Sequence, residues 1–139
     1  MSYNVIADLK GTEKPEEIVI VSDHLDSWDL GTGALDDASG VAISMQVPQL
    51  LKQLKIQPKR TIRVIAWMNE ENGLVGGRTY AQEEDANIAK HFAAIESDLG
   101  ANHPQGVSRG RFGDGGFSFW VGESRTRFAA LNSFISNLS

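Results

Sequence analysis

Acidic and imidazole side chains stand at the ends of three apolar runs of this sequence and at the start of one helix-like segment. They are His24, Asp26, Asp36, Asp37, Glu70, Glu71 and Asp98. Imidazole and carboxylate groups without sulfur hold zinc, manganese or cobalt in hydrolytic sites, and the chain has no cysteine. A carboxylate between two such cations can bridge them while they share a water, and a neighbouring carboxylate that binds no metal can take the proton of that water.

The order of the elements predicts that these side chains meet at one edge of a sheet. We expect strands at 4–10, 18–21, 61–68, 92–95 and 117–121, helices at 38–54, 75–84 and 123–138, and a loop over 100–115. Strands that alternate with helices predict an α/β domain, here a three-layer sandwich whose mostly parallel, mixed sheet is flanked by helices. The carboxyl ends of parallel strands line the ligand crevice. Because so many like charges in one crevice do not all stay ionised without a cation, we expect one or two divalent metals there.

Composition limits the classes of protein to which this chain can belong. Its 139 residues are 41% hydrophobic and 22% charged, which is ordinary for one globular domain. The net charge of −5 disfavours a nucleic-acid partner. No apolar run approaches the ~20 residues of a membrane span, and we see no secretory signal after Met1. The sequence itself therefore leaves the localisation open.

Each of these features also has a structural explanation. Asp36-Asp37 suits the start of a helix, Glu70-Glu71 suits a solvated strand end, and His24 suits a core histidine. A dinucleotide loop at Gly31-Thr32-Gly33 is disfavoured, because Asp36 stands where the third glycine would be and repels a pyrophosphate. Two alternatives to a catalytic site stay open: a non-catalytic metal-binding or interaction domain, and an α/β domain whose acidic edge is simply solvated.

Several blocks of the sequence resemble the co-catalytic zinc exopeptidases, the family of the zinc aminopeptidases and the carboxypeptidase Q branch. These blocks are His24–Asp37, Asn69–Leu74 and Ala94–Asp98. The resemblance implies hydrolysis of a terminal peptide bond, with short peptides or dipeptides as substrates. It also implies a cis peptide bond between Asp36 and Asp37.

The resemblance further implies a role for each matching residue. His24, Asp36 and Asp98 look like the ligands of a first zinc, and Asp36 like the bridge to a second. Glu71 looks like a ligand of that second zinc, and Glu70 like the general base. Asp26 looks like the carboxylate that orients the His24 ring. A complete site of this kind takes two zinc ions.

The sequence departs from the family pattern in several places. Leu99 follows the metal aspartate where the family usually has a small residue, and Pro48 interrupts a helix that is normally free of proline. The glycines that usually precede the metal histidine are Ser22-Asp23 here, and the second-zinc histidine of the family falls in a segment later than Ser139. We therefore expect residues 1–139 to be a partial catalytic domain, without the N-terminal part, the inserted domain and the C-terminal segment of the family. This chain by itself should hold one zinc or none, turn over slowly or not at all, and form homo-oligomers through exposed sheet surface. For the full-length protein, the resemblance suggests a secreted or periplasmic location.

Overall fold

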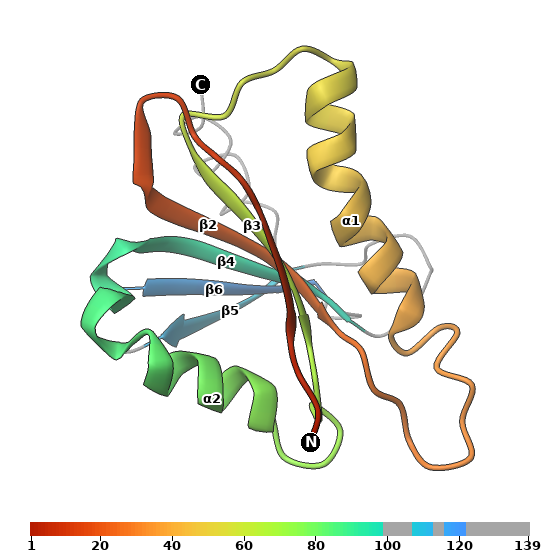
Figure 1. Ribbon diagram of the computed structural model, residues 1–139. Coiled ribbons are helices and arrows are strands. Elements are labelled where there is room, and N and C mark those ends of the chain that lie inside the picture. The colour runs from red at the N-terminus through yellow and green to blue at the C-terminus, as the bar shows by residue number, and fades with distance from the viewer. Residues whose placement is uncertain (99–106, 113–115, 122–139) are drawn as a thin grey trace.

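The computed structural model describes residues 1–98, 107–112 and 116–121, and these form a six-stranded sheet with two α-helices (Figure 1). The strands are β1 (Val5–Leu9), β2 (Lys14–His24), β3 (Arg60–Trp67), β4 (His91–Ser97), β5 (Val107–Phe112) and β6 (Gly116–Val121). The helices are α1 (Ala38–Gln53) and α2 (Val75–Glu83), and a 3₁₀ helix, η1 (Asp85–Lys90), follows α2. The strand order across the sheet is β1-β3-β2-β4-β6-β5.

The centre of the sheet is parallel. Strand β2 pairs in parallel with both β3 and β4, and β4 pairs in parallel with β6, whereas β1 and β5 are antiparallel to their neighbours. His24 at the end of β2 lies beside Trp67 at the end of β3, and Ser22 lies beside Glu96 of β4. The carboxyl ends of β2, β3 and β4 therefore lie at the same edge of the sheet.

Within the described part of the chain, α1 and α2 lie on opposite faces of the sheet, and the alternation of side chains along β2 sets the two cores. Ile18 and Ile20 pack with Ile65 and with Tyr80 of α2. Val19, on the opposite face, packs in a second cluster whose other members are Ile62, Ala93, Leu9, Val21, and Val47 and Leu51 of α1. The β-branched run of β2 is thus buried on both faces. The predicted three-layer α/β sandwich with a mostly parallel, mixed sheet is confirmed.

Most predicted elements lie where the sequence placed them. Helices α1 and α2 and strands β1, β3 and β6 match within one or two residues, and β2 and β4 extend beyond the predicted 18–21 and 92–95. The predicted loop over 100–115 is wrong for 107–112, which form β5. This segment has glycine and two arginines instead of apolar alternation, and it becomes a strand through antiparallel pairing with β6. The predicted helix 123–138 falls outside the described residues.

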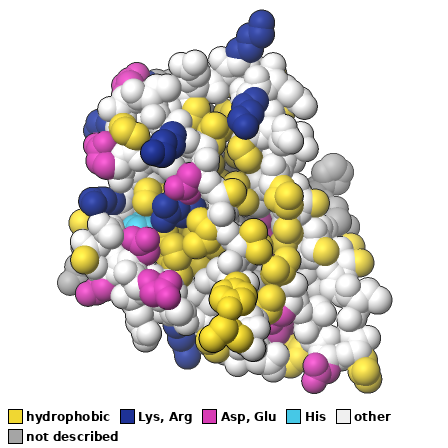
Figure 2. Space-filling model, viewed as in Figure 1, with side chains coloured by type: hydrophobic (Ala, Val, Ile, Leu, Met, Phe, Trp, Pro, Cys, Tyr) yellow, Lys and Arg dark blue, Asp and Glu magenta, His cyan; other side chains and the backbone are white. Residues whose placement is uncertain are grey.

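Apolar side chains are also exposed on the surface. A band of hydrophobic side chains crosses the face drawn in Figure 2. Val5 and Ile6 of β1 are 59% and 46% exposed, and Ile43, Met45, Leu50 and Leu54 on and just after α1 are also exposed. Within the described residues, none of the helices has both the length and the apolar character needed to cross a membrane.

Candidate metal centre

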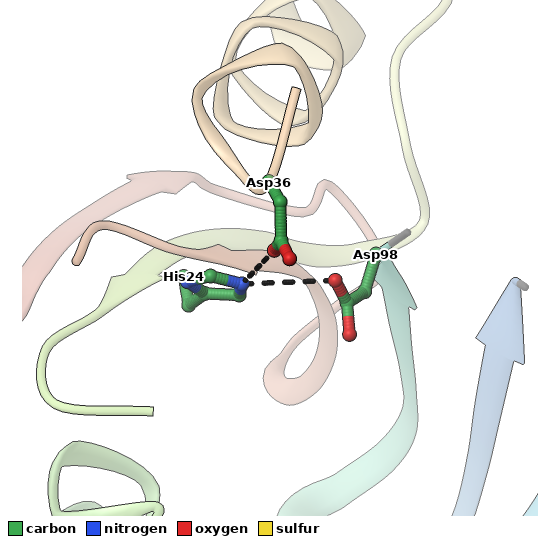
Figure 3. A group of neighbouring side chains, drawn as sticks. All are labelled: His24, Asp36 and Asp98. Atoms are coloured by element: carbon green, nitrogen blue, oxygen red, sulfur yellow. Dashed lines mark hydrogen bonds and ion pairs between the residues drawn. The ribbon is translucent and has the colours of Figure 1, made fainter. Parts of the chain in front are cut away.

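Three side chains from three elements converge at the carboxyl edge of the sheet (Figure 3). His24 ends β2, Asp36 precedes α1, and Asp98 follows β4. Nε2 of His24 lies 2.8 Å from Oδ1 of Asp36 and 3.6 Å from Oδ1 of Asp98. One ligand atom from each residue lies within 4.8 Å of the other two. The side chains of His24 and Asp98 are buried, whereas that of Asp36 is 45% exposed, so the group is accessible from the Asp36 side.

The backbone after β2 orients the His24 ring. Nδ1 of His24 lies 3.0 Å from the carbonyl oxygen of Asp26, so the Nδ1–H tautomer donates to this carbonyl and Nε2 is directed at Asp36. Burial lowers the pKa of His24, but the Asp36 carboxylate and the Asp26 carbonyl outweigh burial and raise this pKa overall. A cation bound at Nε2 would take the place of the proton that the carboxylates stabilise. The donor set therefore fits a metal with nitrogen and oxygen ligands.

The Asp26 carboxylate binds elsewhere than the resemblance implies. Its two oxygens accept hydrogen bonds from the backbone N–H groups of Glu70, at 2.9 Å, and Glu71, at 3.3 Å. Its Oδ1 lies 3.8 Å from Nδ1 of His24, beyond hydrogen-bond distance, so the expected contact with the ring is made by the Asp26 carbonyl instead. The side chain of Asp26 therefore joins the end of β2 to the turn that follows β3.

That turn carries both glutamates toward the same edge of the sheet. It begins at Asn69, whose φ of 61° is left-handed, and Gly73 and Leu74 donate their N–H groups to the Glu70 carbonyl. Burial raises the pKa of Glu70, and the charge of Asp98 adds to this effect. Burial and the charge of Asp36 raise the pKa of Glu71. Glu71 lies outside the three-residue group of His24, Asp36 and Asp98, but its Oε1 is buried without a hydrogen-bond partner among the described residues, as an acceptor awaiting a cation would be.

Beneath the three-residue group lies a second pair of carboxyl groups. Asp37 is 1% exposed; its Oδ2 accepts from the His24 N–H at 3.3 Å and its Oδ1 from the Gly40 N–H at 3.1 Å, which caps α1. The Asp36–Asp37 peptide bond is cis, as the resemblance implied. Asp23 is fully buried, and its Oδ1 accepts from the Ser97 N–H at 3.2 Å. Burial raises the pKa of Asp23 to about 8 and that of Asp37 to about 7.

Two further acidic residues, Asp23 and Glu96, contribute to this electrostatic environment, although no role was predicted for either. Asp23 stands where the family usually has a glycine, and Glu96 lies within a block that resembles the family. Burial raises the pKa of Glu96 to about 7, and the charges of Asp98 and Glu70 act in the same direction. Their position in the sequence was the available signal: each follows the apolar run of its strand and precedes a candidate ligand by one or two residues.

Comparisons of the sequence with known proteins identify a family and several relatives that resemble this chain. The sequence profile of peptidase family M28 matches residues 4–124. Carboxypeptidase Q of Rattus norvegicus is 46% identical over 106 residues, which are 76% of this chain and 22% of the rat protein. Carboxypeptidase Q of Homo sapiens is 44% identical over the same share of this chain. This chain therefore spans between a fifth and a quarter of the length of these relatives.

Solved structures give the same fold. A peptidase M28 precursor from Shewanella amazonensis SB2B is 50% identical and covers 78% of this chain and 24% of its own, with a TM-score of 0.74. A zinc aminopeptidase from Bacillus subtilis is 28% identical and covers 69% of this chain and 24% of its own, with a TM-score of 0.62. The profile match over most of the sequence and this shared architecture lead to one conclusion: the chain belongs to peptidase family M28.

Proposed function

We propose that this chain supplies the first metal site and the general base of a zinc-dependent exopeptidase. The observation that carries the proposal is the convergence of His24, Asp36 and Asp98 from three different elements, with one ligand atom of each within 4.8 Å of the others. Relatives that are named carboxypeptidase Q and zinc aminopeptidase support zinc as the metal and peptides as the substrates.

The residues of the site divide between two metal positions. His24, Asp36 and Asp98 would hold the first zinc, which matches the three protein ligands of a catalytic zinc. Asp36 and Glu71 would hold a second, with Asp36 as the bridge, because Oε1 of Glu71 is buried without a hydrogen-bond partner among the described residues and the charge of Asp36 acts on Glu71. Bound zinc supplies Lewis acidity and lowers the pKa of a water molecule.

Glu70 is suited to move the proton of the attacking water. The two backbone hydrogen bonds to Asp26 fix the turn that carries it, and burial raises its pKa above the ordinary glutamate value. A carboxylate with a raised pKa is a better base near neutral pH. Glu70 would accept the proton from water and donate it to the leaving amine at the terminal peptide bond of a short peptide or dipeptide.

The chain by itself should be a weak catalyst. Among the described residues, only Asp36 and Glu71 are assigned to the second zinc, so we expect one tightly held zinc and a weak second position. The exposed apolar side chains of β1 and α1 favour self-association of this chain. The whole protein would act outside the cytoplasm, in a secreted or periplasmic location, as its resemblance to the carboxypeptidase Q branch suggests.

Zinc content and residual hydrolysis test the proposal together. After zinc saturation and gel filtration, elemental analysis should find one zinc per chain, unchanged in Glu70→Gln and lost in Asp36→Ala. On a dipeptide panel, Glu70→Gln should reduce any hydrolysis by at least ~100-fold. If the chain binds zinc but Glu70→Gln does not reduce its hydrolysis, the general-base role of Glu70 is contradicted. One zinc with no hydrolysis under any condition would favour the non-catalytic metal-binding domain, and no zinc would favour a solvated acidic edge.

A further inference from the structure

A buried junction lies directly beneath the three metal-site residues. It consists of Asp23, Asp37, Gly40 and Ser97, which come from the end of β2, the start of α1 and the end of β4. Each of the three ligands proposed for the first zinc is the sequence neighbour of one junction residue: His24 follows Asp23, Asp36 precedes Asp37, and Asp98 follows Ser97. The junction therefore determines how the three ligand-bearing segments lie relative to one another.

Gly40 shows how closely these segments approach. A Cβ atom on Gly40 would lie 2.3 Å from Oδ1 of Asp37, 2.3 Å from the Ser97 carbonyl oxygen and 2.4 Å from Oδ1 of Asp23. The first turn of α1 thus contacts both carboxyl groups and the end of β4, with no room for a side chain. Such tight packing transmits a small displacement of one group to the others.

Two side chains of the junction make its connections by hydrogen bonds. Asp37 holds the His24 N–H and the Gly40 N–H, and so connects β2 with α1. Asp23 accepts from the Ser97 N–H, with an Oδ1–N distance of 3.2 Å, and so connects β2 with β4 across 74 positions of sequence. The Asp23 bond is placed one residue before Asp98, where the backbone leaves the sheet.

We propose that Asp23 is a positioning residue of the metal centre, whose bond to the Ser97 N–H holds Asp98 at its distance from His24. The proposal rests on the proposed metal site. Asp23 touches neither the metal position nor a substrate; it acts through the backbone of Ser97. Outer partners of this kind commonly change metal affinity by ~10–100-fold when they are removed.

Ser44 offers a matched control for this role. Like Asp23, it is buried, and its side chain acts on the Asp23 carboxyl and lowers the pKa of that group. It lies on α1 at the same face of the sheet, one helical turn beyond Gly40. Ser44→Ala removes a buried polar atom near the junction but leaves the hydrogen bond to β4 intact. A comparison of Asp23→Ala with Ser44→Ala therefore separates the bond of Asp23 to Ser97 from its interaction with Ser44.

The experiment measures the zinc dissociation constant of the folded full chain by competition with a chelator, together with amide hydrogen exchange at Ser97. Asp23→Ala should weaken zinc binding by at least ~10-fold and accelerate exchange at Ser97. Asp23→Asn keeps an acceptor oxygen, so it should bind zinc within ~3-fold of the wild type and protect Ser97. Ser44→Ala should match the wild type. If Asp23→Ala does not fold, Asp23→Leu replaces it in the experiment, because the side chain of leucine branches at the same carbon as that of aspartate but has no acceptor oxygen.

The outcomes separate this proposal from the metal site on which it rests. If the wild-type chain fails to bind zinc, both the proposed metal site and the positioning role of Asp23 are overturned. Zinc binding that is equal in the wild type and in Asp23→Ala would overturn the positioning role alone, even if the variant were less stable. An equal loss of zinc affinity in Asp23→Asn and Asp23→Ala would also overturn the positioning role, because it would show that the acceptor oxygen at position 23 does not determine zinc binding.

Discussion

Two polar clusters of this molecule differ in how their charges are balanced. The first, the Arg63 cluster, consists of Arg63, Asp8, Tyr80 and His91. Nε and Nη2 of Arg63 donate to the two Asp8 oxygens at 2.8 and 2.9 Å, and Nη1 donates to the Tyr80 hydroxyl at 2.8 Å. The Tyr80 hydroxyl in turn lies 2.8 Å from Nε2 of His91, and Nδ1 of His91 lies 3.2 Å from the Asn87 carbonyl.

The second cluster, the metal edge, consists of His24, Asp36, Glu70, Glu71 and Asp98. Here carboxylates gather around an imidazole and raise one another's pKa, as the charges of Asp98 on Glu70 and of Asp36 on Glu71 show. In the Arg63 cluster the hydrogen bond from Arg63 instead lowers the pKa of Asp8. The charges of the Arg63 cluster are therefore balanced by groups of the chain, whereas the metal edge has the electrostatics of a cation site.

The largest expected effect is the response of the two histidines to zinc. Zinc at 100 times its dissociation constant should add about 2.7 kcal/mol to the free energy of unfolding of the wild type, a rise in melting temperature of roughly 10 °C. His24→Ala should abolish this rise, because it removes the nitrogen ligand. His91→Ala should keep it, since His91 belongs to the Arg63 cluster. Thermal unfolding with and without zinc measures the difference. An equal rise in melting temperature in both variants would show that His24 is not the histidine that binds zinc.

The next effect is the pH dependence of the free energy of unfolding of the metal-free protein. The pKa values of Asp23, Asp37 and Glu96 rise from about 4 to between about 7 and about 8 on folding. The folded state therefore holds more protons than the unfolded state in this range, so the free energy of unfolding should fall as pH rises from ~4 to ~8, by more than ~1 kcal/mol.

Urea unfolding with EDTA at pH 5, 6.5 and 8 measures this dependence. Asp8 has the opposite sign: its lowered pKa contributes stability above ~4 that is lost as the pH falls further. Saturating zinc should reduce the decline toward pH 8, because the cation stabilises the ionised carboxylates. Stability that rises steadily from pH 5 to pH 8 in EDTA would contradict the raised pKa values of Asp23, Asp37 and Glu96.

A smaller effect is expected from the Arg63 cluster itself. Arg63→Met should lower the free energy of unfolding by about 1–2 kcal/mol, because it removes the donors of Asp8 and of the buried Tyr80 hydroxyl. The zinc dissociation constant should stay unchanged. Urea unfolding and zinc titration of the same sample check both statements. A loss of zinc affinity in Arg63→Met would show that the two clusters are coupled.

The smallest expected effect is a gain in the free energy of unfolding, whereas Arg63→Met causes a loss. Glu70→Gln should raise the stability of the metal-free protein at pH 8 by about 0.3 kcal/mol, because the charged form of Glu70 is disfavoured in the folded state and the site is partly solvated. Asp8→Asn is the matched control and should lower stability. Urea unfolding of the two variants in EDTA gives the comparison. Destabilisation by Glu70→Gln would mean that its charge is already compensated within the chain.

Local signals in the sequence were sufficient for the fold class and for the edge of the sheet at which the polar side chains gather. The β-branched run Ile18–Val21 and the apolar run in Thr61–Met68 identify buried strands, and polar residues directly after them mark the ends of those strands. Because parallel strands end at one edge, these positions predicted that His24 and several carboxylates would gather there. The resemblance to the zinc exopeptidases then singled out His24, Asp36 and Asp98 as the ligands of one metal. The structure places these three side chains close together. The segment 107–112 lacked such a signal, because a strand at the edge of a sheet is specified by its pairing partner.

Patterns of a few neighbouring residues mark where each strand ends, and therefore indicate which side chains reach the metal edge. The contacts that support these side chains depend on the tertiary structure. The Asp26 carboxylate binds the turn of Glu70 and Glu71, 44 and 45 positions away, and Asp23 binds the Ser97 N–H, 74 positions away. These bonds depend on how closely β2, β4 and α1 pack around Gly40. The physical reason is that a buried carboxyl group takes whichever donors the packing of distant segments brings to it, and no local pattern encodes that choice.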